Sequence, residues 1–380
     1  MTNNEVLHGA LLHAVAKVEH LMEKFPEDFP SASTNDLLYQ HKPNKEWTAG
    51  FFSGMVWLAY EVTNDQRYKQ FAQKQTKSFR MRLDNCIATN FHDLGFLYSL
   101  SCVADYKLTG SEFAKETAVL AAGLLAARFQ KKGQFIQAWS DLDDPEEYRL
   151  IIDCFLNLPL LFWATTVTGD SSYAEIAQAH FKTAVATVIR PDFSTYHTYF
   201  FDRETGKPLR GATNQGYADE SYWSRGQAWA IYGIQLFLQY CPLGFQEENQ
   251  RFLKVLSSFQ EMLSEDSIPV WDFKAKEDSQ LKDSSAAAIV ICGLQTYLSS
   301  PNKEANQKAS ITELKNKMLQ ELMIHYDSIH QESKAKVDGL LLHGTHHWPR
   351  KQGVDEAVLW GDYFYFEALV REAQDWQSYW

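Results

Sequence analysis

Two kinds of apolar pattern alternate along this chain, and this alternation most limits what it can fold into. Segments such as 5–23 and 308–326 place apolar residues on one helical face and charged residues on the other. Segments such as 151–168, 222–240 and 284–299 are apolar on nearly every side. Because a helix that is apolar all round must be buried all round, we expect half-exposed helices to pack outside fully buried ones.

The same periodicity predicts about twelve helices that fill most of the chain. They lie near 5–23, 48–62, 66–82, 91–107, 112–129, 151–168, 172–188, 222–240, 247–263, 284–299, 308–326 and 358–375. Only 196–202 and 269–273 have the pattern of extended segments. Helices that alternate in this way fit six hairpins in an inner and an outer ring, an all-α (α/α)6 barrel. A helical solenoid is the alternative, but the sequence has no repeated motif of fixed period to favour it.

Charge and cysteine content narrow the classes of function. No low-complexity linker divides the 380 residues, so we expect a single catalytic domain over 1–380. The net charge of −12 argues against nucleic acid and anionic membranes as partners, and no apolar run is long enough to span a membrane. The five cysteines are odd in number, include no CxxC pair and lie mostly in apolar runs. We therefore expect reduced thiols in a cytoplasmic protein.

Unusual polar and aromatic residues gather where the apolar helices begin. They occupy 46–54, 90–98, 151–155, 222–229, 282–287 and 359–369. If the inner helices run parallel, all of these starts meet at one mouth of the barrel. Helix N-termini carry partial positive charge, which favours an anionic ligand there.

Two aspartates in these stretches are the candidate catalytic residues. Asp153 lies in IIDCFLNLPLLFW, where apolar neighbours should raise the pKa of its carboxyl group and let it act as general acid and then base. Asp93 lies in FHDLGFLY, and two carboxylates that face one cavity push their pKa values apart. The alternative for both is a helix N-cap, and this capping role is our preferred interpretation of Asp283.

Arginine and tryptophan residues supply candidate ligand contacts. Arg225 enters an apolar helix and needs an anionic partner, either a substrate carboxylate or a buried aspartate. Trp229 lies one turn later on the same face. Trp47 and Trp139 add aromatic surface. A single tryptophan more often lies in the core than in a ligand platform, but three of them beside charged motifs favour sugar stacking.

His197 and the loop 210–219 add polar groups. Gly211 and Gly216 in this loop would let the backbone approach a ligand closely. The histidines of 343–347 resemble a metal cluster, but no HExxH and no carboxylate at ligand spacing accompanies them, which favours a loop role and no metal. The sequence contains no Walker, GxGxxG or GxSxG motif, which argues against the common nucleotide-binding proteins and serine hydrolases.

Six motifs together resemble the unsaturated glucuronyl hydrolases of glycoside hydrolase family 88. They are NFHDLGFLYSL, IIDCFLNLPLL, YHTYFFD, NQGYADESYWSRGQAWAIYG, KDSSAAA and WGDYFYFEAL, and they occur in the family's order. The likeness covers nearly the whole chain, from about Trp47 to Leu369. The resemblance implies an (α/α)6 barrel without metal or organic cofactor. It also implies a substrate with a 4,5-unsaturated uronic acid at the non-reducing end, left by polysaccharide lyases. Glycosaminoglycan disaccharides of chondroitin, hyaluronan and heparin type are the chief expectation.

The resemblance assigns roles to individual residues. Asp153 matches the residue that performs both proton transfers, and Asp93 matches the one that holds the ring hydroxyls. Positions that match the family's substrate contacts and binding loop are Trp47, Trp139, His197, Gly211, Thr213, Gln215, Arg225 and Trp229. Asn214 departs from the family, where a described member has histidine. The segment 343–353 lacks the Ser- and Lys-rich pattern linked to sulfate selection, although Arg350 and Lys351 could meet a sulfate.

Two alternative functions remain open at this point. One is hydrolysis of unsaturated rhamnogalacturonan disaccharides by a related family, and the other is a non-catalytic α/α toroid that binds sugar. As partner we expect an anionic unsaturated oligosaccharide substrate, and we expect the protein to be a monomer or weak homo-oligomer.

Overall fold

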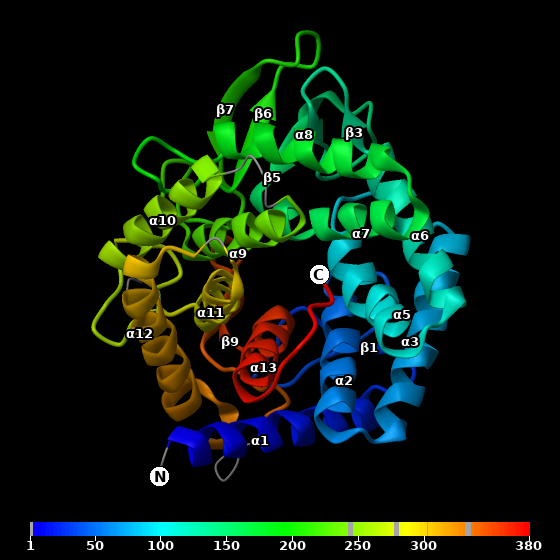
Figure 1. Ribbon diagram of the computed structural model, residues 1–380, viewed down its shortest axis with the longest axis vertical. Helices are drawn as coiled ribbons and strands as arrows, with labels where there is room; N and C mark the ends of the chain where they lie inside the picture. The colour runs from blue at the N-terminus through cyan, green and yellow to red at the C-terminus, as the bar shows by residue number, and fades with distance from the viewer. Residues whose placement is uncertain (1–2, 242–245, 277–280, 302, 331–335) are drawn as a thin grey trace.

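The helices of this chain form two concentric rings, as Figure 1 shows. The computed structural model describes residues 3–241, 246–276, 281–301, 303–330 and 336–380. The outer ring contains α1 (Asn3–Lys24), α3 (Gln66–Asp84), α6 (Glu112–Ala127), α8 (Ser171–Thr187), α10 (Gln246–Glu261) and α12 (Ala305–Glu321). The inner ring contains α2 (Ala49–Thr63), the broken segment α4 (Leu94–Tyr98) to α5 (Ala104–Thr109), α7 (Leu158–Thr168), α9 (Ser224–Tyr240), α11 (Ser284–Ser299) and α13 (Leu359–Ala373).

The inner ring is closed. Going round it, α2 packs against α4, α4 against α7, α7 against α9, α9 against α11, α11 against α13 and α13 against α2. Each outer helix packs on the inner helices nearest to it, for example α10 on α9 and α12 on α11. Closure confirms the expected (α/α)6 barrel and excludes a solenoid, whose ends do not meet.

Burial follows the alternation seen in the sequence. Helices α9, α11 and α13 are buried along almost their whole length. In contrast, α10 buries only one stripe, formed by Asn249, Phe252, Val255, Leu256 and Phe259. The inner helices therefore supply the core, and the outer helices shield it from water.

Two predicted helices are interrupted. The segment 91–107 contains a π-helical turn, Ser99–Val103, between α4 and α5. The Ser101 hydroxyl donates to the Leu97 carbonyl at 2.6 Å, and such side-chain bonds disturb the regular helical ladder. The segment 151–168 begins with a 3₁₀ turn, Ile152–Leu156, and α7 starts only at Leu158, with Pro159 in its first turn.

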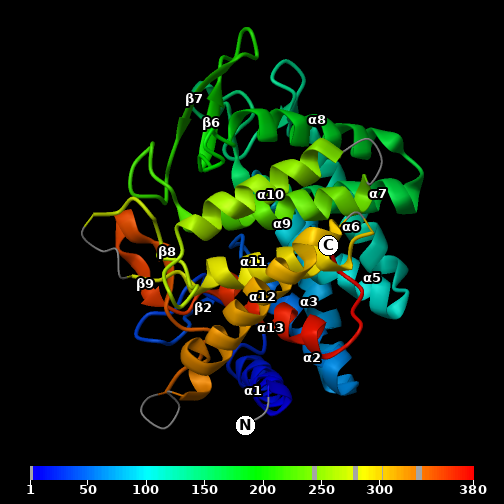
Figure 2. The ribbon, with the colours of Figure 1, turned by 60° about the vertical axis from the view of Figure 1, so that its left-hand side comes forward.

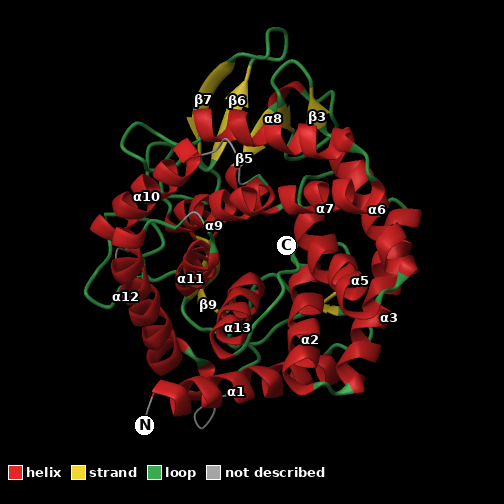
Figure 3. Ribbon diagram, in the orientation of Figure 1, coloured by secondary structure: helices red, strands yellow, loops and turns green. Residues whose placement is uncertain are grey.

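The strands, yellow in Figure 3, are short and belong to the connections between helices. The stretch 196–202 contains β6 (Thr198–Phe201), as predicted, in an antiparallel sheet of order β5-β6-β7 with β5 (Arg149–Ile151) and β7 (Pro208–Ala212). The stretch 269–273 forms only isolated bridges. Three further hairpins were not expected: β1–β2 (Phe29–Pro30, His41–Lys42), β3–β4 (Phe129–Gln130, Phe135–Ile136) and β8–β9 (Gly344–His347, Gln352–Glu356).

The two ends of the barrel differ. Figure 2 shows β6 to β9 gathered on the left side of the molecule, while the C-terminal segment lies on the right. In Figure 1 this segment enters the centre of the inner ring.

All five cysteines are free, and four of them are buried. Among the described residues, no helix combines the length and the apolar character needed to cross a membrane.

Candidate active site

The two predicted catalytic aspartates meet on either side of a histidine. The His92 Nε2 atom lies 3.3 Å from Asp93 Oδ1 and 3.4 Å from Asp153 Oδ1. Within the described part of the chain, neither these carboxylate oxygens nor the two His92 ring nitrogens have a hydrogen-bond partner. Neither aspartate caps a helix with its side chain. The structure therefore favours a chemical role over the capping alternative.

Local folding explains why Asp153 reaches this place. Strand β5 pairs with β6, so that Ile151 lies opposite Thr198, and the Ile152 amide donates to the His197 carbonyl at 3.0 Å. The chain then leaves the sheet in the 3₁₀ turn that contains Asp153. Asp153 is thus held at the junction between the sheet and the inner ring.

A close backbone contact brings the Asp93 segment to the same junction. A Cβ atom on Gly95 would lie 2.3 Å from the Asn157 Cα, so only glycine allows this approach. The Asn157 Oδ1 atom accepts from the Phe96 amide at 2.9 Å, and its Nδ2 donates to the Asp153 carbonyl at 3.3 Å. Asn157 therefore ties both aspartate-bearing segments together.

Burial sets the protonation of this cluster. Desolvation raises the pKa of Asp153 to about 7, although the charge of Arg225 acts in the opposite direction. Desolvation and the neighbouring Asp153 raise the pKa of Asp93 well above its usual value. Burial lowers the pKa of His92 well below 6.5, so the ring is neutral. The Asp153 side chain is 18% exposed against 8% for Asp93, so Asp153 is the more accessible of the two carboxyl groups.

The same three side chains are the one group in the described part of the chain whose geometry suits a metal ion. One ligand atom from each of His92, Asp93 and Asp153 lies within 4.8 Å of the others. Metal binding needs ionised carboxylates, whereas burial here favours protonated ones. In the metal-free protein this group therefore holds protons, which a cation would have to displace. At 343–347, by contrast, His343, His346 and His347 bond separately to Asp355, Ser33 and the Arg350 amide.

Arg225 is almost fully buried, at 2% exposure, and its terminal nitrogens tie α9 to three other segments. It forms an ion pair with Asp283 and donates to the Thr345 carbonyl at 2.6 Å, the His346 carbonyl at 2.7 Å and Gln215 Oε1 at 2.9 Å. The capping role expected for Asp283 is wrong, because its side chain binds Arg225 and Ser285 instead of the helix start.

The polar loop is organised around His197. Its Nδ1 atom accepts from the amides of Asn214 at 2.8 Å and Gln215 at 3.3 Å, which places the ring proton on Nε2. The contact at Asn214 is made by the backbone, so it does not depend on which side chain occupies position 214. Burial lowers the pKa of His197 to about 3, so the ring is a neutral donor.

Two loop residues have structural explanations that the sequence did not suggest. Gly211 lies in β7, and a Cβ atom there would lie 2.3 Å from the Tyr196 ring, so the glycine makes room for protein instead of ligand. The Thr213 hydroxyl accepts from the Gly216 amide at 2.8 Å, which closes the loop turn. Gln215 remains the loop side chain best placed for a ligand, since its amide nitrogen has no partner among the described residues.

Aromatic rings form a continuous layer beside the aspartates, which we call the aromatic floor. Its members are Trp47, Phe96, Trp229, Trp360 and Phe364, with successive ring centroids 5.2 to 5.7 Å apart. Trp47 is partly exposed and offers surface to a ligand, whereas Trp229 is 1% exposed and lies within the floor. Trp139 lies elsewhere, against the Arg149 guanidinium at 4.7 Å, next to the Ala138 carbonyl that binds the His92 amide.

Sequence reasoning missed His92, Gly95 and Asn157 as organising residues. A signal was present, because Asn157 is the second polar residue in the apolar stretch that contains Asp153, and Gly95 follows Asp93 by two residues. Their function rests on a contact between segments about 60 residues apart, which no local pattern reveals.

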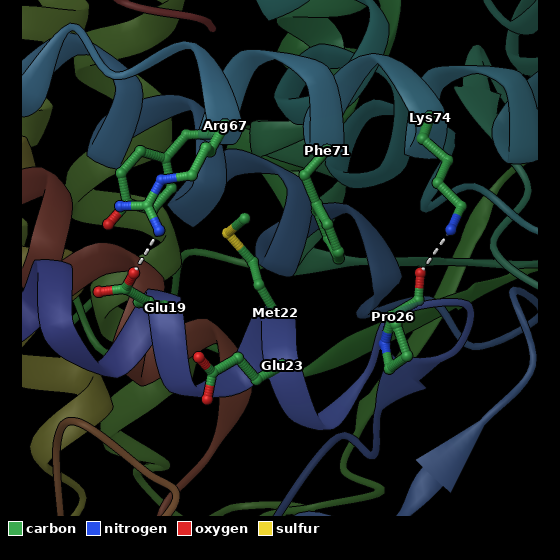
Figure 4. Close-up of a pocket in the computed structure, with 8 residues that line it drawn as sticks. Glu19, Met22, Glu23, Pro26, Arg67, Phe71 and Lys74 are labelled. Carbon is green, nitrogen blue, oxygen red and sulfur yellow. Dashed lines mark hydrogen bonds and ion pairs between the residues drawn. The ribbon is translucent and has the colours of Figure 1, made fainter.

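A hollow on the outer wall lies apart from this cluster (Figure 4). It is formed between α1 and α3 and is lined by Glu19, Met22, Glu23, Pro26, Arg67, Tyr68, Phe71 and Lys74. Arg67 pairs with Glu19 at 2.7 Å and Lys74 donates to the Pro26 carbonyl at 2.8 Å, so both cations of the lining have partners. No predicted site residue lines it.

Comparisons with known proteins agree with this geometry. A family model described as Glycosyl Hydrolase Family 88 matches residues 17–341. The chain is 41% identical over 381 residues to an unsaturated chondroitin disaccharide hydrolase of Streptococcus pneumoniae, covering 100% of this chain and 95% of that protein. A crystal structure of unsaturated glucuronyl hydrolase from Streptococcus agalactiae has a TM-score of 0.94 at 39% identity, covering 100% of this chain and 95% of that chain. An aspartate-to-asparagine mutant of that enzyme, complexed with dGlcA-GalNAc6S, has a TM-score of 0.85 at 37% identity, covering 98% and 93%.

Proposed function

The chain belongs to glycoside hydrolase family 88, and we propose that it removes 4,5-unsaturated uronic acid from the non-reducing end of lyase-generated oligosaccharides. Chondroitin, hyaluronan and heparin disaccharides are the chief substrates of this proposal. The buried pair Asp93–Asp153 carries it, since this pair holds a proton near neutral pH and has carboxylate oxygens without a partner. Protonation of a carbon atom needs a proton donor that is still protonated near neutral pH, and a desolvated carboxyl group meets this need.

The reaction is a hydration of the enol ether. Asp153 gives its proton to C4, the electron pair of the C4=C5 bond forms the new C–H bond, and positive charge is shared by C5 and the ring oxygen. The Asp153 carboxylate then takes a proton from a water molecule as the water oxygen bonds to C5. The resulting hemiketal opens, and the hemiacetal left at C1 releases the neighbouring sugar. This route differs from direct displacement at C1 by two carboxyl groups.

The remaining polar groups have complementary tasks in this proposal. Asp93 holds ring hydroxyls of the uronate. The His197 Nε2–H and the Gln215 amide nitrogen donate to the substrate, since their other atoms are already bonded to Asn214 and Arg225. Trp47 and Trp139 contact sugar rings, while Arg225 provides a fixed positive charge near the substrate carboxylate.

Other properties of the protein are proposed on weaker observations. We propose that it works in the cytoplasm, which the five free thiols support, and that it binds neither nucleic acid nor membrane, which the net charge of −12 supports. We also propose one domain over 1–380, because residues near the C-terminus contact the inner helices. A monomer or weak homo-oligomer is expected.

The proposed activity is tested by following the ultraviolet absorbance of the enol ether. Purified protein is expected to lower the absorbance of unsaturated chondroitin disaccharides, because hydration removes the double bond. EDTA is expected to leave the rate unchanged, since the proton chemistry needs no metal. Faster cleavage of unsaturated rhamnogalacturonan disaccharides would favour the related pectin-degrading activity, and no change with any substrate would favour the sugar-binding toroid.

The rate is expected to depend on pH through Asp153. Only the protonated form gives a proton to C4, so kcat/KM should fall as the pH rises through about 7, the pKa of this carboxyl group. The measurement is kcat/KM from pH 5 to about 9, after a check that the protein survives incubation at each pH. A rate that increases through this range instead would show that ionised Asp153 is the active form and would contradict the assigned role.

A further inference from the structure

The C-terminal segment closes the end of the inner ring opposite the aspartates. The Lys107 ammonium donates to the carbonyls of Ser378 at 2.7 Å and of Tyr379 and Trp380 at 3.3 Å. Tyr240 donates to the Trp380 carbonyl at 2.8 Å. Since these side chains come from α5 and α9, and further bonds reach α2 and α13, the segment is fastened to four inner segments.

The Trp380 side chain of this segment packs against the inner helices. It is 2% exposed, and its ring stacks on Phe364 with centroids 5.8 Å apart at 10°. Its edge meets Phe96 at 6.0 Å. Its Nε1 donates to Glu367 Oε2 at 2.9 Å, so the indole is fixed in orientation as well as position.

Both of these partners are members of the aromatic floor. Phe96 contacts Trp47 at 5.7 Å and Trp229 at 5.6 Å, and Phe364 contacts Trp229 at 5.7 Å. Phe96 also belongs to the helical turn that begins at Asp93, and its amide is bonded to Asn157. One layer of rings therefore separates Trp380 from the partly exposed Trp47 and from the turn that carries Asp93.

We propose that Trp380 is a positioning residue for the hydrolase reaction. By packing against Phe96 and Phe364 it supports the aromatic floor and so fixes the positions of Trp47 and Asp93. This inference rests on the proposed function. Interiors are close-packed, so loss of the indole leaves a cavity into which Phe96 and Phe364 can shift. A displacement of about 1 Å at a remote site can cost roughly 100-fold in rate.

The test is chemical rescue of Trp380→Ala. We expect kcat/KM of this variant to fall by roughly 100-fold. Displacement of Trp47 should change KM, and displacement of Asp93 should change kcat. Free indole fits the cavity, because apolar cavities in proteins bind aromatic molecules of matching size. Indole is therefore expected to restore most of the rate and the near-ultraviolet circular dichroism of the floor, and to leave the wild type unaffected.

Control variants separate support of the floor from simple loss of stability. Trp376 lies in the same segment, but it bonds to Glu61 at 2.9 Å and does not contact the floor. Trp376→Ala should therefore keep the wild-type rate, and added indole should not change that rate. Trp380→Phe keeps a flat aromatic ring, whereas Trp380→Leu keeps only an apolar side chain. The Phe variant should therefore hydrolyse substrate faster than the Leu variant. These two variants carry the test if the alanine variant does not fold.

Several outcomes would overturn the proposal. A folded Trp380→Ala with the wild-type rate would do so, as would a slow variant that indole does not restore, or equal rates for the Phe and Leu variants. A wild-type protein that is inactive on every unsaturated disaccharide contradicts the proposed function instead. In that case the loss of the near-ultraviolet signal in Trp380→Ala, and its return with indole, still tests the support of the floor.

Discussion

Replacement of Asp153 by asparagine is expected to lower kcat by roughly 10²–10⁴-fold while the fold is retained. Asparagine has the size of aspartate and keeps the backbone bonds of the 3₁₀ turn, but it cannot deliver a proton to carbon. Asp153 is the more accessible member of the aspartate pair, at 18% side-chain exposure, and its carboxyl oxygen Oδ1 has no partner in the described chain. The measurement is the enol-ether assay, with far-ultraviolet circular dichroism to verify folding.

The same substitution should change how stability depends on pH. Burial raises the pKa of Asp153 from 3.8 to about 7, so between these values the folded state holds a proton that the unfolded state has lost. Its contribution to stability is therefore present below pH 3.8 and decreases as the pH rises to about 7. Since asparagine does not titrate, Asp153→Asn should gain stability relative to the wild type as the pH rises, by an amount on the order of a few kcal/mol.

Asp362 provides a matched control for this prediction. It also lies near the start of an inner helix, and burial likewise raises its pKa to about 7. Its oxygens are bonded to Tyr39 at 2.9 Å and to the Leu341 amide at 2.8 Å, which marks a structural role. Asp362→Asn should therefore alter stability but keep turnover. Equal loss of turnover in both variants, or full turnover in Asp153→Asn, would refute the assignment.

The fold could be predicted from the sequence because helix burial is a local property. Helices that are apolar on every side, such as 284–299, must be buried by other helices, and their alternation with amphipathic ones favours an inner and an outer layer. The π-helical turn at 99–103 and the hairpin β8–β9 could not be predicted in this way. Both depend on competing local hydrogen bonds or on strand pairing, which leave little trace in apolar periodicity.

The sequence could indicate the candidate residues of the site but not the contacts between them. An aspartate in an apolar run identifies Asp153, because such a group is expensive to bury without a task. The sequence does not show which charged residues form a pair. Arg225 lies 58 residues from Asp283 in the sequence, and only the folded helical ring brings the two together. The same applies to Trp229, whose position one turn after Arg225 fits either a ligand surface or the floor in which it lies.

Replacement of Arg225 by methionine is expected to destabilise the protein by about 3–5 kcal/mol. The substitution leaves Asp283, which is completely buried, without its counter-charge. It also frees the carbonyls of Thr345 and His346, so β8 loses its attachment to α9. Gln215 loses the bond that orients its amide, so we expect kcat/KM to fall as well. Urea unfolding and the enol-ether assay measure the two effects.

Two further variants distinguish charge from geometry in this cluster. Arg225→Met combined with Asp283→Leu removes both buried charges and should recover part of the lost stability, because an isolated buried charge costs more than a missing pair. The double variant should nevertheless stay slow, since Gln215 remains without its orienting donor. Arg225→Lys keeps the positive charge but lacks the planar guanidinium group that donates to several acceptors. Its stability should therefore be close to that of the wild type, whereas its rate should be clearly lower. If the double variant were no more stable than Arg225→Met, the loss would come from the broken carbonyl contacts and not from the unpaired carboxylate.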